Sequence, residues 1–298
     1  MKRCLVCKGP FRQSGWQCPK CGFTPETRSG VLQFDPGIAD KGDSYNPAWY
    51  EELARLEDRN FWFRARNRLI AWLARRHLPA SANFLEIGCG TGYVLRMLRE
   101  EFPGWRITAS EMFPDAFPFA ARRVDSSVQL QQFDARAIPY RDEFDAIGAF
   151  DVIEHIEDDA GVLNEVCAAL KPQGLLIASV PQHKFLWSRY DEIGHHFRRY
   201  ELPDLSVRLC AAGFQVVETT SFNSLLLPLL WLSRKMRKIA NDADLLDELR
   251  IGGAMNELLY AVLALEFAFV RIGVRWPAGG SRIFVARKIP EAASRAVH

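Results

Sequence analysis

Three closely spaced glycines, Gly88, Gly90 and Gly92, follow the apolar run 84–87 and precede a stretch with helical spacing. Glycine tolerates a positive φ and lets a ligand lie against bare backbone. The N–H groups at the start of a helix can bind a carboxylate or a phosphate. The dinucleotide fingerprint G-x-G-x-x-G needs a third glycine where this sequence has Tyr93. The loop therefore departs from the dinucleotide pattern, and its neighbours must decide which ligand it binds.

Acidic residues follow the glycine loop at the ends of three predicted strands. Glu111, Asp134 and Asp151 each come directly after an apolar pattern of strand length. Ligands of parallel α/β sheets bind at the carboxyl ends of the strands, and an acid about twenty residues past such a loop can accept both ribose hydroxyls. This assigns the ribose to Glu111. Each acid alone could cap the next helix, but three in order after the loop favour a ligand role for the set.

The segment Glu86-Ile87-Gly88-Cys89-Gly90-Thr91-Gly92 resembles motif I of class I S-adenosylmethionine (SAM)-dependent methyltransferases. The resemblance covers roughly residues 60–220 and the last strand. It implies that Asp134 accepts a hydrogen bond from the adenine amino group. The SAM-contacting residues that it implies are Arg64, Glu86, Gly88, Gly90, Gly92, Glu111, Met112, Asp134, Ala135 and Phe150.

Arg64 enters this set through the segment 61–70, F-W-F-R-A-R-N-R-L-I. Related methyltransferases carry a similar F-W-F-R-x-R helix just before motif I, in which an arginine approaches the SAM carboxylate. Arginine suits that role because its guanidinium pairs with a carboxylate through two bonds. The alternative is an amphipathic helix with a solvated arginine face, which the pattern alone favours.

The segment 150–158, F-D-V-I-E-H-I-E-D, resembles motif IV of the methyltransferase group that includes the ubiquinone-biosynthesis O-methyltransferases. Some members of that group hold a divalent cation with an acid, a glutamate and a histidine at this spacing. Asp151, Glu154 and His155 match those positions. The alternative is that His155 packs near SAM while the acids cap a helix. We favour that alternative, because two carboxylates and an imidazole often occur together without a metal.

Two histidines lie in the segment 194–200, G-H-H-F-R-R-Y, after the fifth predicted strand. Its H-x-R-R-Y pattern resembles the loop that borders the acceptor in many small-molecule methyltransferases. The resemblance implies His196 as the first candidate for a general base and His195 as the second. The alternative is a basic loop with stacked aromatic side chains and no chemistry.

Four of the seven cysteines form two C-x-x-C pairs near the start of the chain. Cys4, Cys7, Cys18 and Cys21 could surround Zn²⁺ tetrahedrally, since each pair presents two thiolates on one tight turn. The arrangement resembles a zinc ribbon, and a closed four-cysteine site is structural. Four reduced thiols or a redox pair are the alternatives. The odd cysteine count and the absence of an apolar run at the amino terminus lead us to expect reduced thiols in a cytoplasmic protein.

The elements that must position these residues alternate between strand and helix from residue 84 onward. Such alternation predicts a doubly wound, mostly parallel sheet of seven strands with helices on both faces. We expect a zinc-ribbon segment at 1–30, a linker with helices at 31–80, and a methyltransferase domain at 81–298. The linker could hold a short strand near Val31. A helical insertion at 222–280 precedes the last strand.

The insertion contains two apolar runs, 225–232 and 258–270, and the first is followed by a basic cluster. Neither run reaches about eighteen uncharged apolar residues, so neither is expected to cross a membrane. An apolar helix beside a basic cluster can lie in a membrane interface. The alternatives are a dimer surface or, as we slightly favour, a lid over the acceptor and His196.

Composition narrows the choice of acceptor. The 298 residues include 38 Lys and Arg against 36 Asp and Glu, a net charge of +2, which argues against a nucleic-acid partner. The predicted function is transfer of a methyl group from SAM to a small or lipid-linked acceptor, with a hydroxyl oxygen as the expected nucleophile. The alternatives are a ribbon-guided RNA or protein methyltransferase and a SAM-binding module without turnover. The sequence indicates no oligomeric state.

Overall fold

The central sheet explains how residues far apart in the chain reach one edge. The computed structural model describes residues 1–35, 37, 47–236 and 249–290. Seven strands form the expected, mostly parallel sheet, and only the last of them, β11, runs antiparallel to its neighbours β9 and β10. These strands are β5 (Asn83–Ile87), β6 (Arg106–Glu111), β7 (Gln129–Gln132), β8 (Phe144–Phe150), β9 (Leu170–Pro181), β10 (Phe214–Phe222) and β11 (Ser281–Lys288).

Two further strands extend this sheet to nine, so the expectation of seven was too low. The strand order is β10-β11-β9-β8-β5-β6-β7-β4-β3. β4 (Val31–Gln33) pairs in parallel with β7, and β3 (Glu26–Arg28) pairs with β4. The strand expected near Val31 is therefore present, and β3 lies within the predicted zinc-ribbon segment 1–30. The division of the chain at residues 30 and 80 stays a prediction.

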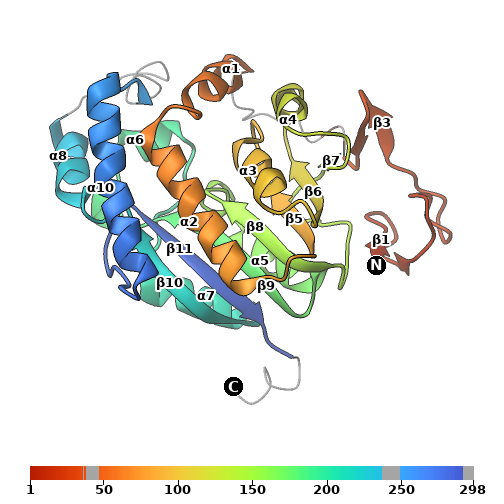
Figure 1. The fold of residues 1–298 in the computed structure, drawn as a ribbon. Coiled ribbons are helices and arrows are strands. Elements are labelled where there is room, and N and C mark those ends of the chain that lie inside the picture. The colour runs from red at the N-terminus through yellow and green to blue at the C-terminus, as the bar shows by residue number, and fades with distance from the viewer. Residues whose placement is uncertain (36, 38–46, 237–248, 291–298) are drawn as a thin grey trace.

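Helices cover both faces of the sheet, and each face has its own apolar core (Figure 1). Alternate residues of β5 point to opposite cores: Phe84 belongs to one, Leu85 and Ile87 to the other. The first core includes side chains from α2 (Phe61–His77), α3 (Tyr93–Glu101) and α10 (Gly253–Arg271). The second includes side chains from α5 (Asp159–Ala169) and α7 (Leu202–Ala211). The remaining helices are α1 (Pro47–Leu56), α4 (Phe117–Arg123), α6 (Arg189–Ile193) and α8 (Leu227–Met236).

The cysteine-rich segment is tied to the main sheet. Its hairpin consists of β1 (Lys2–Arg3) and β2 (Pro10–Phe11). The buried Arg3 side chain donates to the Ile138 carbonyl at 2.8 Å and forms an ion pair with Glu165. Trp16 meets the rings of Phe34 and Tyr140 edge-on, with centroids 4.7 and 5.4 Å apart. The segment is therefore packed against the sheet.

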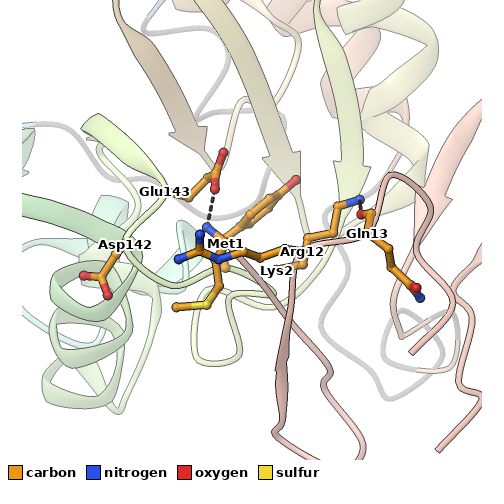
Figure 2. Close-up of a pocket in the computed structure, with 7 residues that line it drawn as sticks. Met1, Lys2, Arg12, Gln13, Asp142 and Glu143 are labelled. Carbon is orange, nitrogen blue, oxygen red and sulfur yellow. Dashed lines mark hydrogen bonds and ion pairs between the residues drawn. The ribbon is translucent and has the colours of Figure 1, made fainter. Parts of the chain in front are cut away.

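A cavity of about 570 Å³ lies at this junction (Figure 2). Glu143, which directly precedes β8, forms an ion pair there with the Met1 amino group. The cavity therefore lies at the amino end of β8, whereas the predicted site lies at the carboxyl ends of the strands. Its lining is Met1, Lys2, Arg12, Gln13, Tyr140, Asp142 and Glu143. We assign it no chemistry.

The insertion before β11 folds into helices α8 and α10. α10 packs along α2, where the Asn256 side chain accepts from the Phe61 N–H at 2.8 Å and donates to the Arg59 carbonyl at 2.8 Å. α8 buries none of its side chains, and Leu225, Leu229 and Trp231 are 37%, 53% and 39% exposed. A lid over His196 stays a prediction.

Among the described residues, one helix is long and apolar enough to cross a membrane by length and composition alone. It is α10, which has 19 residues and a mean hydropathy of 1.4. We expected the second apolar run to be too short to cross a membrane, and by helix length and mean hydropathy this expectation was wrong. The run gains length because Gly253–Glu257, which precede it, are also helical.

Candidate functional site

The glycine loop joins β5 to α3 and takes a backbone path that favours glycine at three positions. Gly88, Gly90 and Gly92 have φ values of 67°, 49° and 79°. A Cβ on Gly88 would lie 2.5 Å from Val152, and one on Gly92 would lie 2.9 Å from the Ala120 Cα. A Cβ on Gly90 would meet nothing within 4 Å. Two glycines thus serve packing, while Gly90 borders open space.

Glu111 holds this loop from the end of the neighbouring strand. Its buried carboxylate accepts hydrogen bonds from the N–H groups of Gly90 at 3.0 Å, Met112 at 2.7 Å and Phe113 at 3.2 Å. Burial raises the pKa of this carboxyl, and the three N–H groups act in the opposite direction. The predicted ribose acid thus lies directly beside the loop.

A second set of hydrogen bonds fixes the glycine loop, and the sequence did not predict it. Glu57 is buried just after α1 and accepts from the Thr91 hydroxyl at 2.5 Å and from Arg123 of α4 at 2.6 Å. Arg123 also donates to the Ala54 carbonyl of α1 at 2.8 Å. This network ties α1 and α4 to the glycine loop. Glu57 belongs to no motif, and the sequence predicts only a helix there.

Glu86 is the buried acid of β5, immediately before the loop. One of its carboxylate oxygens has no hydrogen-bond partner among the described residues, and the side chain is inaccessible to solvent. Burial raises the pKa of Glu86 to about 8, although the positive charge of Arg66 acts to lower it. A buried acid with an open oxygen beside a glycine turn is suited to a polar, positively charged ligand.

The arginine of α2 that lies near Glu86 is Arg66 and not the predicted Arg64. The Arg66 guanidinium is buried and forms an ion pair with Asp151, the residue after β8. Arg64 instead pairs with Glu257 of α10 at 2.5 Å and lies 3.9 Å from the centre of the Tyr260 ring. Two positions along a helix face different directions, and the sequence did not reveal that α10 would cover the face of Arg64.

Three other predicted SAM contacts lie at the strand ends as expected. Asp134 follows β7 and Phe133, and its carboxylate accepts from the Arg136 side chain at 2.7 Å. Ala135 is buried beside it, and Phe150 is buried at the end of β8. The role of Asp134 toward an adenine ring stays a prediction, because in this structure its carboxylate is engaged by Arg136.

The loops after β8 and β9 bring two histidines and a glutamate together. Ligand atoms of Glu154, His155 and His196 all lie within 4.8 Å of one another, and the two rings meet edge-on at 4.6 Å. Asp151, which would share a cation with Glu154 and His155 in the less favoured interpretation of the sequence, instead contacts Arg66 and the Ser179 hydroxyl. It is replaced in this cluster by His196 because the ion pair with Arg66 fixes its carboxylate elsewhere.

Burial disfavours the charged forms of Glu154 and His155. Burial lowers the pKa of His155 to about 3, and the nearby His196 acts in the same direction. Burial and the negative charge of Asp151 raise the pKa of Glu154 well above its usual range. One buried Glu154 oxygen has no hydrogen-bond partner in the described part of the chain.

A buried carboxylate orients His196. The Nδ1 atom of His196 lies 2.9 Å from Oδ1 of Asp191, which also accepts from Arg199 at 2.7 Å. Burial acts to raise the pKa of Asp191, but the hydrogen bonds and charges of His196 and Arg199 outweigh it and lower this pKa. His195 is exposed, with φ of 54°, and lies outside this arrangement. The sequence analysis did not identify Asp191.

The rest of the H-x-R-R-Y pattern fixes the loop. Arg198 donates to the carbonyls of Ile156 and Glu157 at 2.7 Å each. The Tyr200 hydroxyl donates to the buried carboxylate of Asp159 at 2.9 Å. These bonds attach the loop after β9 to the loop after β8, so the position of His196 is set by several elements at once.

The comparisons with known proteins agree with this geometry. A family model described as a methyltransferase domain matches residues 55–219, more than half of the chain's 298 residues. The chain belongs to this methyltransferase family. As the resemblance implied, it is a class I SAM-dependent methyltransferase, with SAM as its methyl donor.

Individual relatives match in part of their length. A probable SAM-dependent methyltransferase of Mycolicibacterium smegmatis is 28% identical over 55% of this chain and 63% of its own length. A ubiquinone biosynthesis O-methyltransferase of Xanthomonas axonopodis is 27% identical over 51% of this chain and 70% of its own length. A malonyl-[acyl-carrier protein] O-methyltransferase of Acetivibrio thermocellus is 28% identical, but the match spans only 36% of that protein.

Solved structures share the fold. The SAM complex of phosphoethanolamine N-methyltransferase 2 from Haemonchus contortus has a TM-score of 0.57 at 19% identity, covering 89% of this chain and 62% of that one. A Haloferax volcanii complex that contains the Trm112 methyltransferase activator has a TM-score of 0.55 at 17% identity, covering 83% of this chain and 100% of the matched chain.

The residues at the carboxyl edge fit SAM. Gly90 leaves open space where a side chain would stand, and Glu111 lies beside it. Glu86 offers a buried, unpartnered oxygen near this loop. These three residues would hold the methyl donor, which is cationic at its sulfonium and amino groups.

A proton measurement tests the role of Glu86. Because its pKa is about 8 in the ligand-free chain, Glu86 is mostly protonated at pH 7, and a nearby positive ligand should lower that pKa and expel the proton. Binding of SAM at pH 7 is expected to release close to one proton, and this release should fade as the pH rises past 8. Calorimetry in two buffers of different protonation enthalpy measures it. Glu86→Gln should release none.

The four cysteines of the amino-terminal segment fit Zn²⁺. Their sulfur atoms all lie within 4.8 Å of one another. The backbone turns back after each pair, with hydrogen bonds from Cys4 N–H to the Gly9 carbonyl at 2.9 Å and from Cys18 N–H to the Phe23 carbonyl at 2.8 Å. Four thiolates at this separation are a tetrahedral donor set, and the metal would close the segment without catalysis.

Metal content tests this cluster. Purified protein is expected to carry about one zinc per chain, and Cys18→Ser should lose it because three thiolates hold the ion far less tightly. Cys210→Ser, which changes an exposed cysteine on α7, is the matched control and should keep the zinc. Elemental analysis of protein purified without chelator would contradict this assignment by finding no zinc in the wild type.

Proposed function

We propose that this methyltransferase transfers the SAM methyl group to a hydroxyl oxygen of a small or lipid-linked acceptor. The observation that supports the proposal is the Asp191–His196 pair, fixed in the loop after β9 at the carboxyl edge of the sheet. The two O-methyltransferase relatives support an oxygen acceptor. The cytoplasmic location inferred from the cysteines stays a prediction.

The geometry gives His196 a defined direction of proton transfer. With the hydrogen on Nδ1 donated to Asp191, the other ring nitrogen, Nε2, is left as a proton acceptor. SAM supplies a carbon bound to a positively charged sulfur, from which an attacking oxygen can displace the sulfide. As the oxygen–carbon bond forms and the carbon–sulfur bond breaks, Nε2 of His196 takes the hydroxyl proton. Asp191 then stabilises the resulting imidazolium.

A base is useful for one kind of oxygen acceptor and not for another. A hydroxyl is almost wholly protonated at neutral pH, so its oxygen gains nucleophilicity when a base removes the proton. A carboxylate is already ionised and needs only positioning. A buried aspartate, itself bound by a buried arginine, orients His196. Because only a hydroxyl needs such a base, this arrangement favours a hydroxyl acceptor.

A divalent cation held by Glu154, His155 and His196 is a second route to the same reaction. Its support is the 4.8 Å grouping of three ligand atoms and the open Glu154 oxygen. A cation there would act as a Lewis acid on the acceptor oxygen. Two imidazoles favour a transition metal over magnesium. In Cys18→Ser, which should lack the four-cysteine zinc, activity that falls on dialysis against a chelator and returns with Mn²⁺ would assign this route in place of the free base.

A methyl-transfer screen tests the proposal. The full chain is incubated with methyl-labelled SAM and either hydroxylated small molecules, lipid-linked sugars, RNA or protein. Label is expected in a hydroxylated or lipid-linked acceptor. Label only in RNA or protein would replace the proposal with a ribbon-guided macromolecular methyltransferase. SAM binding with no transfer to any class would favour a binding module without turnover.

A further inference from the structure

The outer face of α10 is apolar although it faces solvent. Its inner side packs against the domain through Leu259 and Leu263. On the outer side, Leu258, Leu265 and Ile272 are 58%, 55% and 78% exposed, and they recur at the seven-residue spacing of two helical turns. A surface helix of a soluble domain normally turns polar residues outward. α10 thus carries an apolar stripe on each side.

α8 has the same unusual character. Leu229, Leu232 and Met236, spaced by three and four residues, are 53%, 46% and 72% exposed. The two helices are neighbours, because Glu266 of α10 accepts hydrogen bonds from the Ser224 and Leu225 N–H groups just before α8 at 2.7 and 2.9 Å (Figure 1). We call the six exposed side chains Leu229, Leu232, Met236, Leu258, Leu265 and Ile272 the apolar face.

Among the described residues, basic side chains lie beside the apolar face on both helices. Lys235 and Arg271 are exposed on α8 and α10, and the Lys235 ammonium lies 4.2 Å from the centre of the exposed Trp231 ring. The exposed acid of this part of α10, Glu257, is neutralised by Arg64. An apolar helix face with tryptophan and basic residues at its border is typical of helices that lie in a membrane interface.

We propose that the apolar face docks on the surface of an anionic lipid bilayer, with Lys235 and Arg271 at the level of the phosphates. Docking along the surface fits the structure better than crossing, although α10 is long enough to cross. Asn256 and Glu266 of α10 are buried and hydrogen-bonded to the domain. Crossing would pull both polar side chains into hydrocarbon, which is costly.

This surface also adjoins the loop that carries His196. The Arg234 guanidinium of α8 lies 3.7 Å from the centre of the Tyr190 ring in α6. α6 ends at Ile193 and contains Asp191, the residue that orients His196. Docking would therefore hold the acceptor site beside the bilayer, where a lipid-linked hydroxyl is available. This last step rests on the proposed function, whereas the binding to lipid does not.

Vesicle sedimentation of the full chain tests the docking. The chain is expected to pellet with vesicles of phosphatidylcholine and phosphatidylglycerol and about tenfold less with phosphatidylcholine alone, because basic residues add to apolar insertion. Leu229→Glu with Leu232→Glu should weaken binding to the anionic vesicles by at least about tenfold. Val207→Glu, at a 70% exposed position on α7, is the matched control and should bind as the wild type does.

Calorimetric SAM binding by each variant shows that it remains folded. Anionic vesicles that fail to pellet the wild type, or that pellet the double variant equally well, would overturn the proposal. A dimer in sedimentation velocity that the same substitutions dissociate, without vesicle binding, would assign the face to a second copy instead. Vesicle binding with no methyl transfer to any hydroxyl would leave the docking standing and remove the proposed function alone.

Discussion

Glu111→Ala is expected to weaken SAM binding by roughly two orders of magnitude. In the structure this carboxylate is buried at the end of β6 and accepts three backbone N–H groups, one of them from Gly90 in the glycine loop. Removing it takes away the acceptor of those three N–H groups and the predicted acceptor for the ribose hydroxyls. A hydrogen bond to a charged group contributes about 1.5–3 kcal/mol, so losing two of them corresponds to a factor of about 100 or more in affinity.

Calorimetry with SAM or its demethylated product measures this change. Glu111→Gln keeps the size of the side chain and should lose less affinity, since its oxygen can still accept. Glu100→Ala removes an acid whose side chain is 69% exposed on α3 and should bind SAM as the wild type does. Wild-type affinity in Glu111→Ala would show that the acid of β6 only supports the loop and does not hold the ligand.

His196→Ala is expected to lower turnover by about two orders of magnitude or more while SAM affinity stays within a factor of about two. The reason is that general-base catalysis typically contributes 10²- to 10⁴-fold, and His196 lies in the loop after β9 rather than in the glycine loop. Asp191→Asn keeps the shape of the positioning residue but alters its hydrogen bond to Nδ1. It should lower turnover as well and shift the pH–rate profile, because the charge that stabilises the imidazolium is gone.

His195→Asn is the matched control for this pair of variants. His195 is exposed and has a positive φ that asparagine tolerates. Its turnover should stay near the wild-type value. Equal turnover in the wild type and His196→Ala would remove the base and leave positioning of the acceptor as the source of rate. An unchanged pH–rate profile in Asp191→Asn would show that Asp191 has only a structural role.

The sequence predicted the central part of this fold because the hydrophobic pattern and the glycines are local signals. α2 contains the segment 61–70 that resembles the helix before motif I, and β5, the loop and α3 follow in the expected order. Glu111 lies beside the loop as expected, since parallel strands bring their carboxyl ends to one edge. These inferences needed only the order of elements along the chain.

What the sequence could not predict depended on contacts between distant segments. β3 is three residues long and polar, and it is a strand only because it pairs with β4, which in turn pairs with β7. Arg64 pairs with a helix almost two hundred positions later in the chain, and Arg66 pairs with Asp151 just after β8. His196, and not Asp151, lies beside Glu154 because the ion pair with Arg66 holds the Asp151 carboxylate elsewhere. Asp191 carried no motif at all, and only the folded loop revealed it.

The chemical nature of the labelled product tests most directly that this methyltransferase acts on a hydroxyl through His196. The product of the screen is treated with mild alkali and the retained label is counted. A methyl ether resists alkali, whereas a methyl ester is cleaved to volatile methanol. We predict that the label stays with the acceptor, is formed in equal amount to demethylated SAM, and falls at least about a hundredfold in His196→Ala. Label released as methanol, formed equally fast by His196→Ala, would show a carboxylate acceptor and contradict both the hydroxyl and the base.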